Sequence, residues 1–119
     1  MKAIKFVIIM IALVVGINAS AQKQVNQKKS NVTTVNIKVR GNCDMCKSRI
    51  EKAAQVNGVT KATWNSNTEA LTLAYNPAVV SSDNVQKKIA AVGHDTEKFK
   101  APDKVYNNLP GCCQYDRKK

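Results

Sequence analysis

The sequence predicts an α+β fold, a ferredoxin-like βαββαβ sandwich with two helices on one face of a four-stranded antiparallel sheet. Four short runs are expected to form strands, residues 32–39, 59–64, 69–75 and 96–99, and the alternation of apolar and polar residues typical of half-buried strands is clearest in 32–39 and 69–75. Apolar residues with helical spacing occur in two further runs, residues 44–56 and 83–92. Because each helical run lies between two strand runs, right-handed crossovers place both helices on the same face of the sheet.

The first strand and the first helix are separated by a short junction. Ile37 and Val39 alternate with polar residues, so we expect their side chains to face the core. The helical spacing begins at Asp44 and stops at Asn57-Gly58, because glycine readily takes the left-handed conformation that follows a helix. The sequence thus predicts a strand, a tight loop and a helix in direct succession.

The second and third strands are joined by a polar turn at residues 65–68, which predicts a hairpin. Trp64 is expected to point into the core from the second strand. Leu71, Leu73 and Tyr75 are expected to point into the core from the third.

The second helix has clear start and stop signals. Ser81 is a good N-cap for a helix over residues 83–92, and Gly93 ends it. A short last strand over residues 96–99 completes the sheet. After residue 100 no regular pattern remains.

Residues 1–21 have the features of a cleaved secretory signal, with a basic start, an apolar run of about a dozen residues and small residues before a cut between Ala21 and Gln22. The run is shorter than the ~20 residues of a membrane span, so the mature form is not expected to span a membrane. Residues 22–31 are polar and predict a disordered leader. We therefore expect an exported protein, periplasmic or secreted.

The formal net charge of the chain is +11, of which Lys2 and Lys5 leave with the signal. A basic chain attracts nucleic acid or anionic membranes, but here the basic residues are scattered without a dense run. We expect a cationic, soluble surface and no nucleic-acid partner. The length that remains supports one small domain, expected to be a monomer.

The four cysteines form two close pairs, Cys43 with Cys46 and Cys112 with Cys113. Adjacent cysteines rarely bond to each other because the geometry is strained, so the pairs indicate thiol sites more than a disulfide framework. If the helix begins at Asp44, the first pair lies at its N-terminus, where free N–H groups and the helix dipole stabilise anions. This environment lowers a thiol pKa and favours a metal ligand or a nucleophile.

The predicted connectivity brings the junction before the first helix and the loop after the second helix to the same end of the sheet. Cys43, Cys46 and His94 should therefore be neighbours at one rim. His94 is for this reason a candidate additional metal ligand.

The sequence resembles the heavy-metal-associated domain family in four places, Gly41-Asn42-Cys43-Asp44-Met45-Cys46, Asn57-Gly58-Val59, Tyr75-Asn76-Pro77 and Ala91-Val92-Gly93-His94-Asp95. That family includes copper chaperones, metal-binding repeats of copper-transporting ATPases and a periplasmic mercury-binding protein. The resemblance covers residues 32–99.

The resemblance implies that Cys43 and Cys46 bind one soft ion, Cu(I) or Hg(II), and pass it on by ligand exchange. The implied partner is a metal-donor or metal-acceptor protein, such as a metal-transporting membrane protein. Two thiolates suit soft ions of low coordination number, whereas Zn(II) prefers four ligands and is the weaker candidate. Members of the family carry Met where this chain has Gly41, so the apolar support of the loop is missing here or comes from Met45.

Residues 100–119 form a C-terminal tail outside the resemblance, and this tail contains Cys112 and Cys113. A dozen extended residues after the last strand span roughly 35 Å, enough to return to Cys43 and Cys46. One hypothesis is that the tail adds thiolates to the site, which would then suit Cu(I) or even Zn(II). The alternative is a flexible tail whose thiols are oxidised or bind metal separately.

Two other functions use the same features. A thiol–disulfide exchange protein would use Cys43 as the attacking thiol, but the order of elements does not resemble a thioredoxin. An RNA-recognition domain shares the βαββαβ order, but residues 69–75 lack its basic-Gly-aromatic signature. No other catalytic motif is found, so we do not expect an enzyme.

Overall fold

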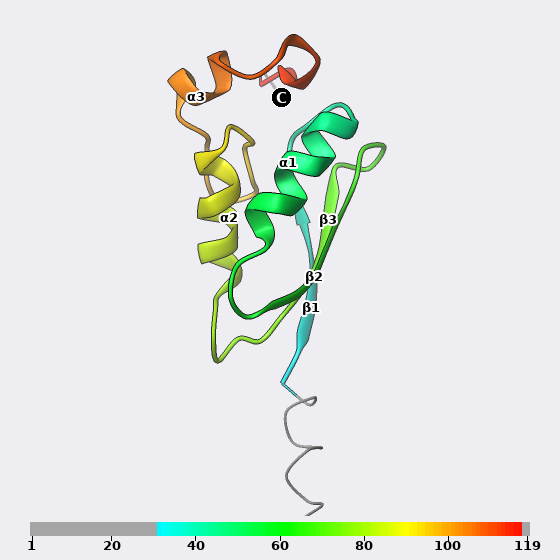
Figure 1. Cartoon of the computed structure of the whole chain (residues 1–119), viewed down its shortest axis with the longest axis vertical. Helices are drawn as coiled ribbons and strands as arrows, with labels where there is room; N and C mark the ends of the chain where they lie inside the picture. Colours follow the sequence, from blue (N-terminus) through cyan, green and yellow to red (C-terminus); the bar gives the residue numbers. More distant parts are fainter. Residues whose placement is uncertain (1–30, 118–119) are drawn as a thin grey trace, which may run out of the picture. The chain divides into compact units, whose positions relative to one another are not determined.

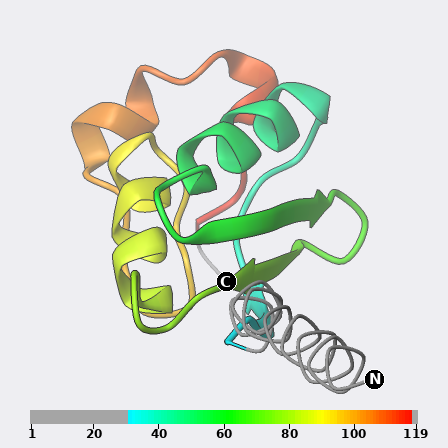
Figure 2. The ribbon, with the colours of Figure 1, turned by 60° about the horizontal axis from the view of Figure 1, so that its bottom comes forward.

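The computed structural model describes residues 31–117, so the predicted signal (1–21) and nearly all of the predicted leader (22–31) lie outside the described residues. The elements follow one another as β1 (Thr33–Lys38), α1 (Asp44–Ala54), β2 (Val59–Asn65), β3 (Ala70–Tyr75), α2 (Ser82–Ala91), α3 (Asp103–Asn107) and the 3₁₀ turn η1 (Gly111–Cys113). The predicted α+β architecture is confirmed, with α1 and α2 on one face of an antiparallel sheet (Figures 1 and 2).

The sheet of the described residues has three strands in the order β1-β3-β2, with β3 in the centre. The register places Ile37 opposite Leu71 on one side of β3 and Trp64 opposite Leu71 on the other. All three side chains face the helices and are buried. The alternation of apolar residues thus predicted correctly which face of the sheet forms the core.

The predicted fourth strand over residues 96–99 is not confirmed. Only an isolated antiparallel bridge joins Val39 to Thr96. The Thr96 N–H donates to the Phe99 carbonyl at 2.8 Å, and the Phe99 N–H donates to the Thr96 hydroxyl at 3.1 Å. These bonds close a tight turn, which prevents the segment from extending beside β1 beyond a single residue.

The helix starts agree with their sequence signals. Cys43 is the N-cap of α1, with extended backbone, and α1 ends at Ala54, two residues before the predicted end. The Ser81 hydroxyl accepts a hydrogen bond from the Asn84 N–H at 3.1 Å and so caps α2. Gly58 has a φ of +98°, the left-handed conformation that favours glycine.

The tail is folded where the sequence showed no pattern. After α3 it forms η1, which lies against α1, and it crosses the end of the molecule at which α1 begins (Figure 1). Leu109, Cys113 and Tyr115 are buried and belong to the same apolar cluster as the helix and sheet residues. Within residues 31–117, no helix has the length and apolar character to cross a membrane.

Candidate metal-binding site

The two thiols of the junction lie at the start of α1, as predicted. Cys43 is half-buried at the N-cap and Cys46 is fully buried in the first turn. Their Sγ atoms are 3.5 Å apart. The Asn42 N–H donates to the Cys46 sulfur at 3.4 Å, so backbone dipoles of the loop point at the sulfurs.

The tail brings two more thiols to the same place. The Sγ of Cys43 lies 3.4 Å from that of Cys112 and 3.6 Å from that of Cys113, and the two tail sulfurs are 3.9 Å apart. All four cysteines are free thiols. Within the described residues, Cys43, Cys112 and Cys113 form a group whose sulfurs all lie within 4.8 Å of one another, an arrangement able to hold a metal ion.

Trp64 packs against the loop between β1 and α1 and supports it. The sequence predicted that this apolar support would be missing or would come from Met45. A Cβ on Gly41 would lie 2.9 Å from the Trp64 ring, so the indole fills the space under the loop. The Trp64 Nε1–H donates to the Val39 carbonyl at 3.0 Å, which fixes the ring. Met45 is instead 53% exposed, with its sulfur 3.5 Å from that of Cys112.

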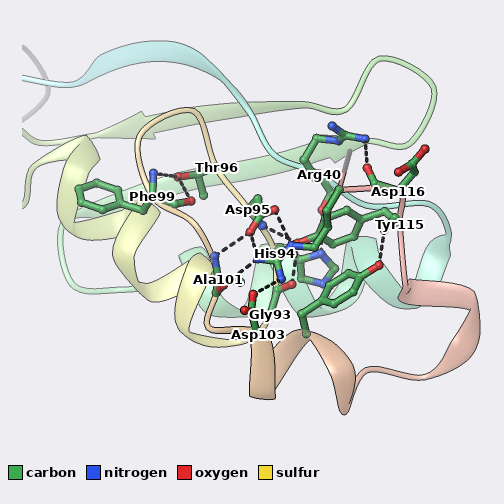
Figure 3. A network of polar contacts seen from close by, with 12 residues as sticks. Arg40, Gly93, His94, Asp95, Thr96, Phe99, Ala101, Asp103, Tyr115 and Asp116 are labelled. Carbon is green, nitrogen blue, oxygen red and sulfur yellow. Dashed lines mark hydrogen bonds and ion pairs between the residues drawn. The ribbon is translucent and has the colours of Figure 1, made fainter. Parts of the chain in front are cut away.

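His94 lies outside the thiol group. Its ring is fully buried, with Nδ1 2.8 Å from the Arg40 carbonyl oxygen. The ring stacks on that of Tyr115, with 5.7 Å between the ring centroids (Figure 3). Its Nε2 is buried with no hydrogen-bond partner among the described residues. Burial lowers the pKa of His94 although the hydrogen bond to the Arg40 carbonyl opposes it, so the ring packs as a neutral group between the loop at Arg40 and Tyr115 of the tail.

No family model matches the sequence. Among curated proteins, the copper-exporting P-type ATPase of Staphylococcus saprophyticus is 42% identical over 59 residues, which are 49% of this chain and 7% of that protein. The copper-exporting P-type ATPase of Staphylococcus epidermidis RP62A is 34% identical over 79 residues, 65% of this chain and 10% of that protein. The chain therefore spans at most a tenth of the length of these relatives.

Solved structures match this chain over most of their own length. A CopZ metallochaperone has a TM-score of 0.52 and 27% identity, over 54% of this chain and 98% of that chain. Oxidized MerP from Ralstonia metallidurans CH34 has a TM-score of 0.53 and 26% identity, over 56% and 94%. The folded part of the chain is therefore similar to heavy-metal-associated domains.

A third structural neighbour is the N-terminal domain of a potential copper-translocating P-type ATPase from Bacillus subtilis, solved in its Cu(I)-loaded state. It has a TM-score of 0.52 and 27% identity, over 55% of this chain and 84% of that one. These likenesses show that the fold of this chain is shared with metal-binding domains of other proteins.

Polar contacts hold the tail on the loop that follows α2. The Tyr115 hydroxyl donates to the Gly93 carbonyl and accepts from the Asp95 N–H, both at 2.8 Å (Figure 3). Arg117 donates to both Asp95 carboxylate oxygens, at 2.7 and 2.9 Å, and to the Ala101 carbonyl at 2.7 Å. The loop after α2 thus receives the tail directly beyond the cysteines.

The thiols of the site differ in acidity. The Cys46 backbone N–H lowers the pKa of Cys43 to about 7, against the effect of burial, and the thiols of Cys112, Cys46 and Cys113 add to the lowering. The hydrogen bond to Cys43 raises the pKa of Cys112, and burial raises that of Cys113. Of Cys43, Cys112 and Cys113, Cys43 is therefore the thiol that ionises most readily near neutral pH.

The sequence reasoning missed the residues that hold the tail, namely Asp95, Tyr115 and Arg117. Asp95 stands next to His94 in a matched motif, which is a weak signal for a function at this loop. Tyr115 and Arg117 follow the last cysteine in a segment without hydrophobic periodicity, so the sequence gives no signal that they dock the tail.

Proposed function

We propose that the protein is an exported metal-binding protein that holds one Cu(I) or Hg(II) ion with the thiolates of Cys43 and Cys46 and passes it on by ligand exchange. The observation that carries this proposal is the meeting of two sulfurs, 3.5 Å apart, at the N-terminus of α1 in a heavy-metal-associated domain. Free N–H groups there stabilise the anionic ligands that a soft cation needs.

Copper is the better-supported ion. The curated relatives are copper-exporting ATPases, and a metallochaperone and a Cu(I)-loaded ATPase domain share the fold. Mercury stays in the proposal because MerP shares the fold to the same degree. Both ions are soft and bind thiolates in preference to oxygen ligands.

The proposed partner is a metal-transporting ATPase or another thiol-bearing carrier. Cys43 is half-buried at the rim of the domain, so an incoming thiolate can approach the ion before a resident sulfur leaves. Transfer by such an exchange needs no release of free metal. The basic surface would favour a partner with acidic residues around its own thiols.

The test is an anaerobic titration of the reduced protein with Cu(I), Hg(II) and Zn(II), each in competition with a chelator of known affinity. We expect tight binding of Cu(I) or Hg(II) at one ion per chain, lost when both Cys43 and Cys46 are replaced by Ser. Ser48→Ala, on the same helix, serves as the matched control and should bind as the original chain does. Failure to bind any of the three ions would refute the proposal.

Thiol–disulfide exchange is the second candidate, favoured by the low pKa of Cys43 and by three thiols within 3.6 Å of it. A low pKa makes a good attacking thiolate. Turnover of a disulfide substrate by the metal-free protein, abolished by Cys43→Ser, would support this function over metal transfer.

A further inference from the structure

We propose that the tail completes the metal site, with Cys43, Cys112 and Cys113 as a three-thiolate set for a Cu(I)-class ion. The tail then supplies the two coordination positions that Cys46 and a partner's thiol would otherwise take. This inference rests on the proposed function. It differs from it in assigning ligands outside the heavy-metal-associated domain and in predicting retention of the ion until the tail moves.

The sulfur spacing favours three ligands over two. Metal–sulfur bonds of about 2.3 Å put two sulfurs about 4.6 Å apart in a linear site and about 4.0 Å apart in a trigonal one. The Cys43 and Cys46 sulfurs are 3.5 Å apart, well short of the linear spacing. The distances within the three-thiol set are 3.4, 3.6 and 3.9 Å, and all three are nearer to the trigonal than to the linear spacing.

The tail is ordered before any ion arrives. The Cys113 N–H donates to the Pro110 carbonyl at 2.8 Å, which closes η1 and turns both tail thiols toward α1. Leu109 packs against Gly93, where an added Cβ would meet its side chain at 2.9 Å. Because these contacts already fix the backbone, binding the ion does not have to order the tail, and the gain in affinity is correspondingly larger.

Binding of the ion by these three thiols involves loss of protons and no oxidation or reduction. Each thiol that becomes a ligand gives its proton to solvent, the ion keeps its charge of +1, and no electron is exchanged. Cys46 remains beside Cys43 as a fourth sulfur, buried and accepting the Asn42 N–H. It is placed to take over when a tail sulfur leaves.

The docked tail is expected to control transfer of the ion to other thiols. An external thiol must compete with tail thiols that are part of the same molecule, whose effective concentration is in the millimolar range or above. The intact tail should therefore retain the ion against free thiols. Release of the tail should expose the two-sulfur site of Cys43 and Cys46 to a partner.

The test compares Cu(I) affinity, measured anaerobically against a competing chelator, for the reduced full chain and for Cys112→Ser. Cys112 is exposed, so this substitution removes a ligand without opening the core. We expect binding at least ~10-fold weaker, because loss of even an outer-shell partner changes metal affinity by this much. Asn108→Ser, which places a serine at another exposed position of the tail, is the matched control and should bind as the original chain does.

Two further results separate the failures. If the original chain binds no soft ion, the proposed function itself is wrong. If it binds tightly and Cys112→Ser and Cys113→Ser both bind equally tightly, the domain binds metal but the tail contributes no ligand, which overturns this inference. Amide spectra of Gly93 and Tyr115 in each metal-free variant establish that the tail is still docked, so that an affinity change reports the lost sulfur.

Discussion

The two cysteine pairs meet at one point but are held there by different forces. Cys43 and Cys46 are positioned by the start of α1 and by the Trp64 ring beneath the loop, so apolar burial fixes them. The tail pair is held by η1, by burial of Leu109 and Cys113 in the apolar cluster, and by polar contacts of Tyr115 and Arg117 with the loop after α2. Because the tail also depends on polar contacts that single substitutions can remove, we expect its docking to weaken before the domain unfolds.

The largest effect is expected from Trp64→Ala, which should disturb the first pair. The side chain is buried, and loss of a buried Trp destabilises a domain by about 3–5 kcal/mol. Urea unfolding of the metal-free protein measures the change. A loss below about 1 kcal/mol would mean that the ring does not support the loop in the way described here.

A smaller but specific effect is expected from Cys43→Ser. Its sulfur is within 3.6 Å of the other three, so it belongs to both the domain pair and the tail set. Cu(I) affinity in chelator competition should fall about 100-fold or more, further than for Cys46→Ser or Cys112→Ser alone. Equal losses for the three variants would contradict the central position of Cys43.

Arg117→Gln should break the tail contact and leave the domain intact. The guanidinium is largely buried against Asp95, and hydrogen bonds to charged groups contribute about 1.5–3 kcal/mol. We expect faster amide exchange at Cys113 and Tyr115 with little change in the exchange of β3. Lys104→Gln on exposed α3 is the control, and an equal effect there would point to charge alone.

The smallest effect is expected from lowering the pH, which should weaken tail docking by protonating Asp95. Burial raises the pKa of Asp95, but hydrogen bonds from Arg117 and from the Ala101 N–H outweigh it and leave the pKa below its ordinary value of 3.8. Lys100 also favours the carboxylate. A lowered pKa means that the contribution of the carboxylate to tail docking is complete above pH 3.8 and is lost as the pH falls further.

The measurement is the amide spectrum of the metal-free tail between pH 7 and pH 3. Undocking should begin only at the acid end of this range. Asp95→Asn keeps the shape of the side chain and should remove the pH dependence. The same acid transition in that variant would assign it to another group.

Most of the fold followed from periodicity, and the exception is informative. Apolar alternation placed Ile37, Trp64 and Leu71 on the buried face, and the cap residue Ser81 marked the start of α2. The last strand failed because the Thr96 side chain and backbone bond within the segment instead of to β1. Such local side-chain bonds compete with a sheet and leave no trace in the hydrophobic pattern.

The site was predictable in part. The spacing of Cys43 and Cys46 and a helix start between them indicated a thiol pair at a helix N-terminus. That Cys112 and Cys113 lie beside Cys43 and Cys46 was one of two open hypotheses. The length of the tail allows this contact but does not require it. Contacts of single polar side chains such as Arg117 help to dock the tail beside the first cysteine pair. Hydrophobic periodicity does not reveal such contacts.

The most direct test of this account is X-ray absorption at the copper edge of the Cu(I)-loaded, reduced protein. We predict three sulfur ligands in the original chain and two after Cys112 and Cys113 are both replaced by Ser. Two sulfurs in both proteins would show that the tail stays outside the coordination sphere, and the account of a closed, tail-completed site would be wrong.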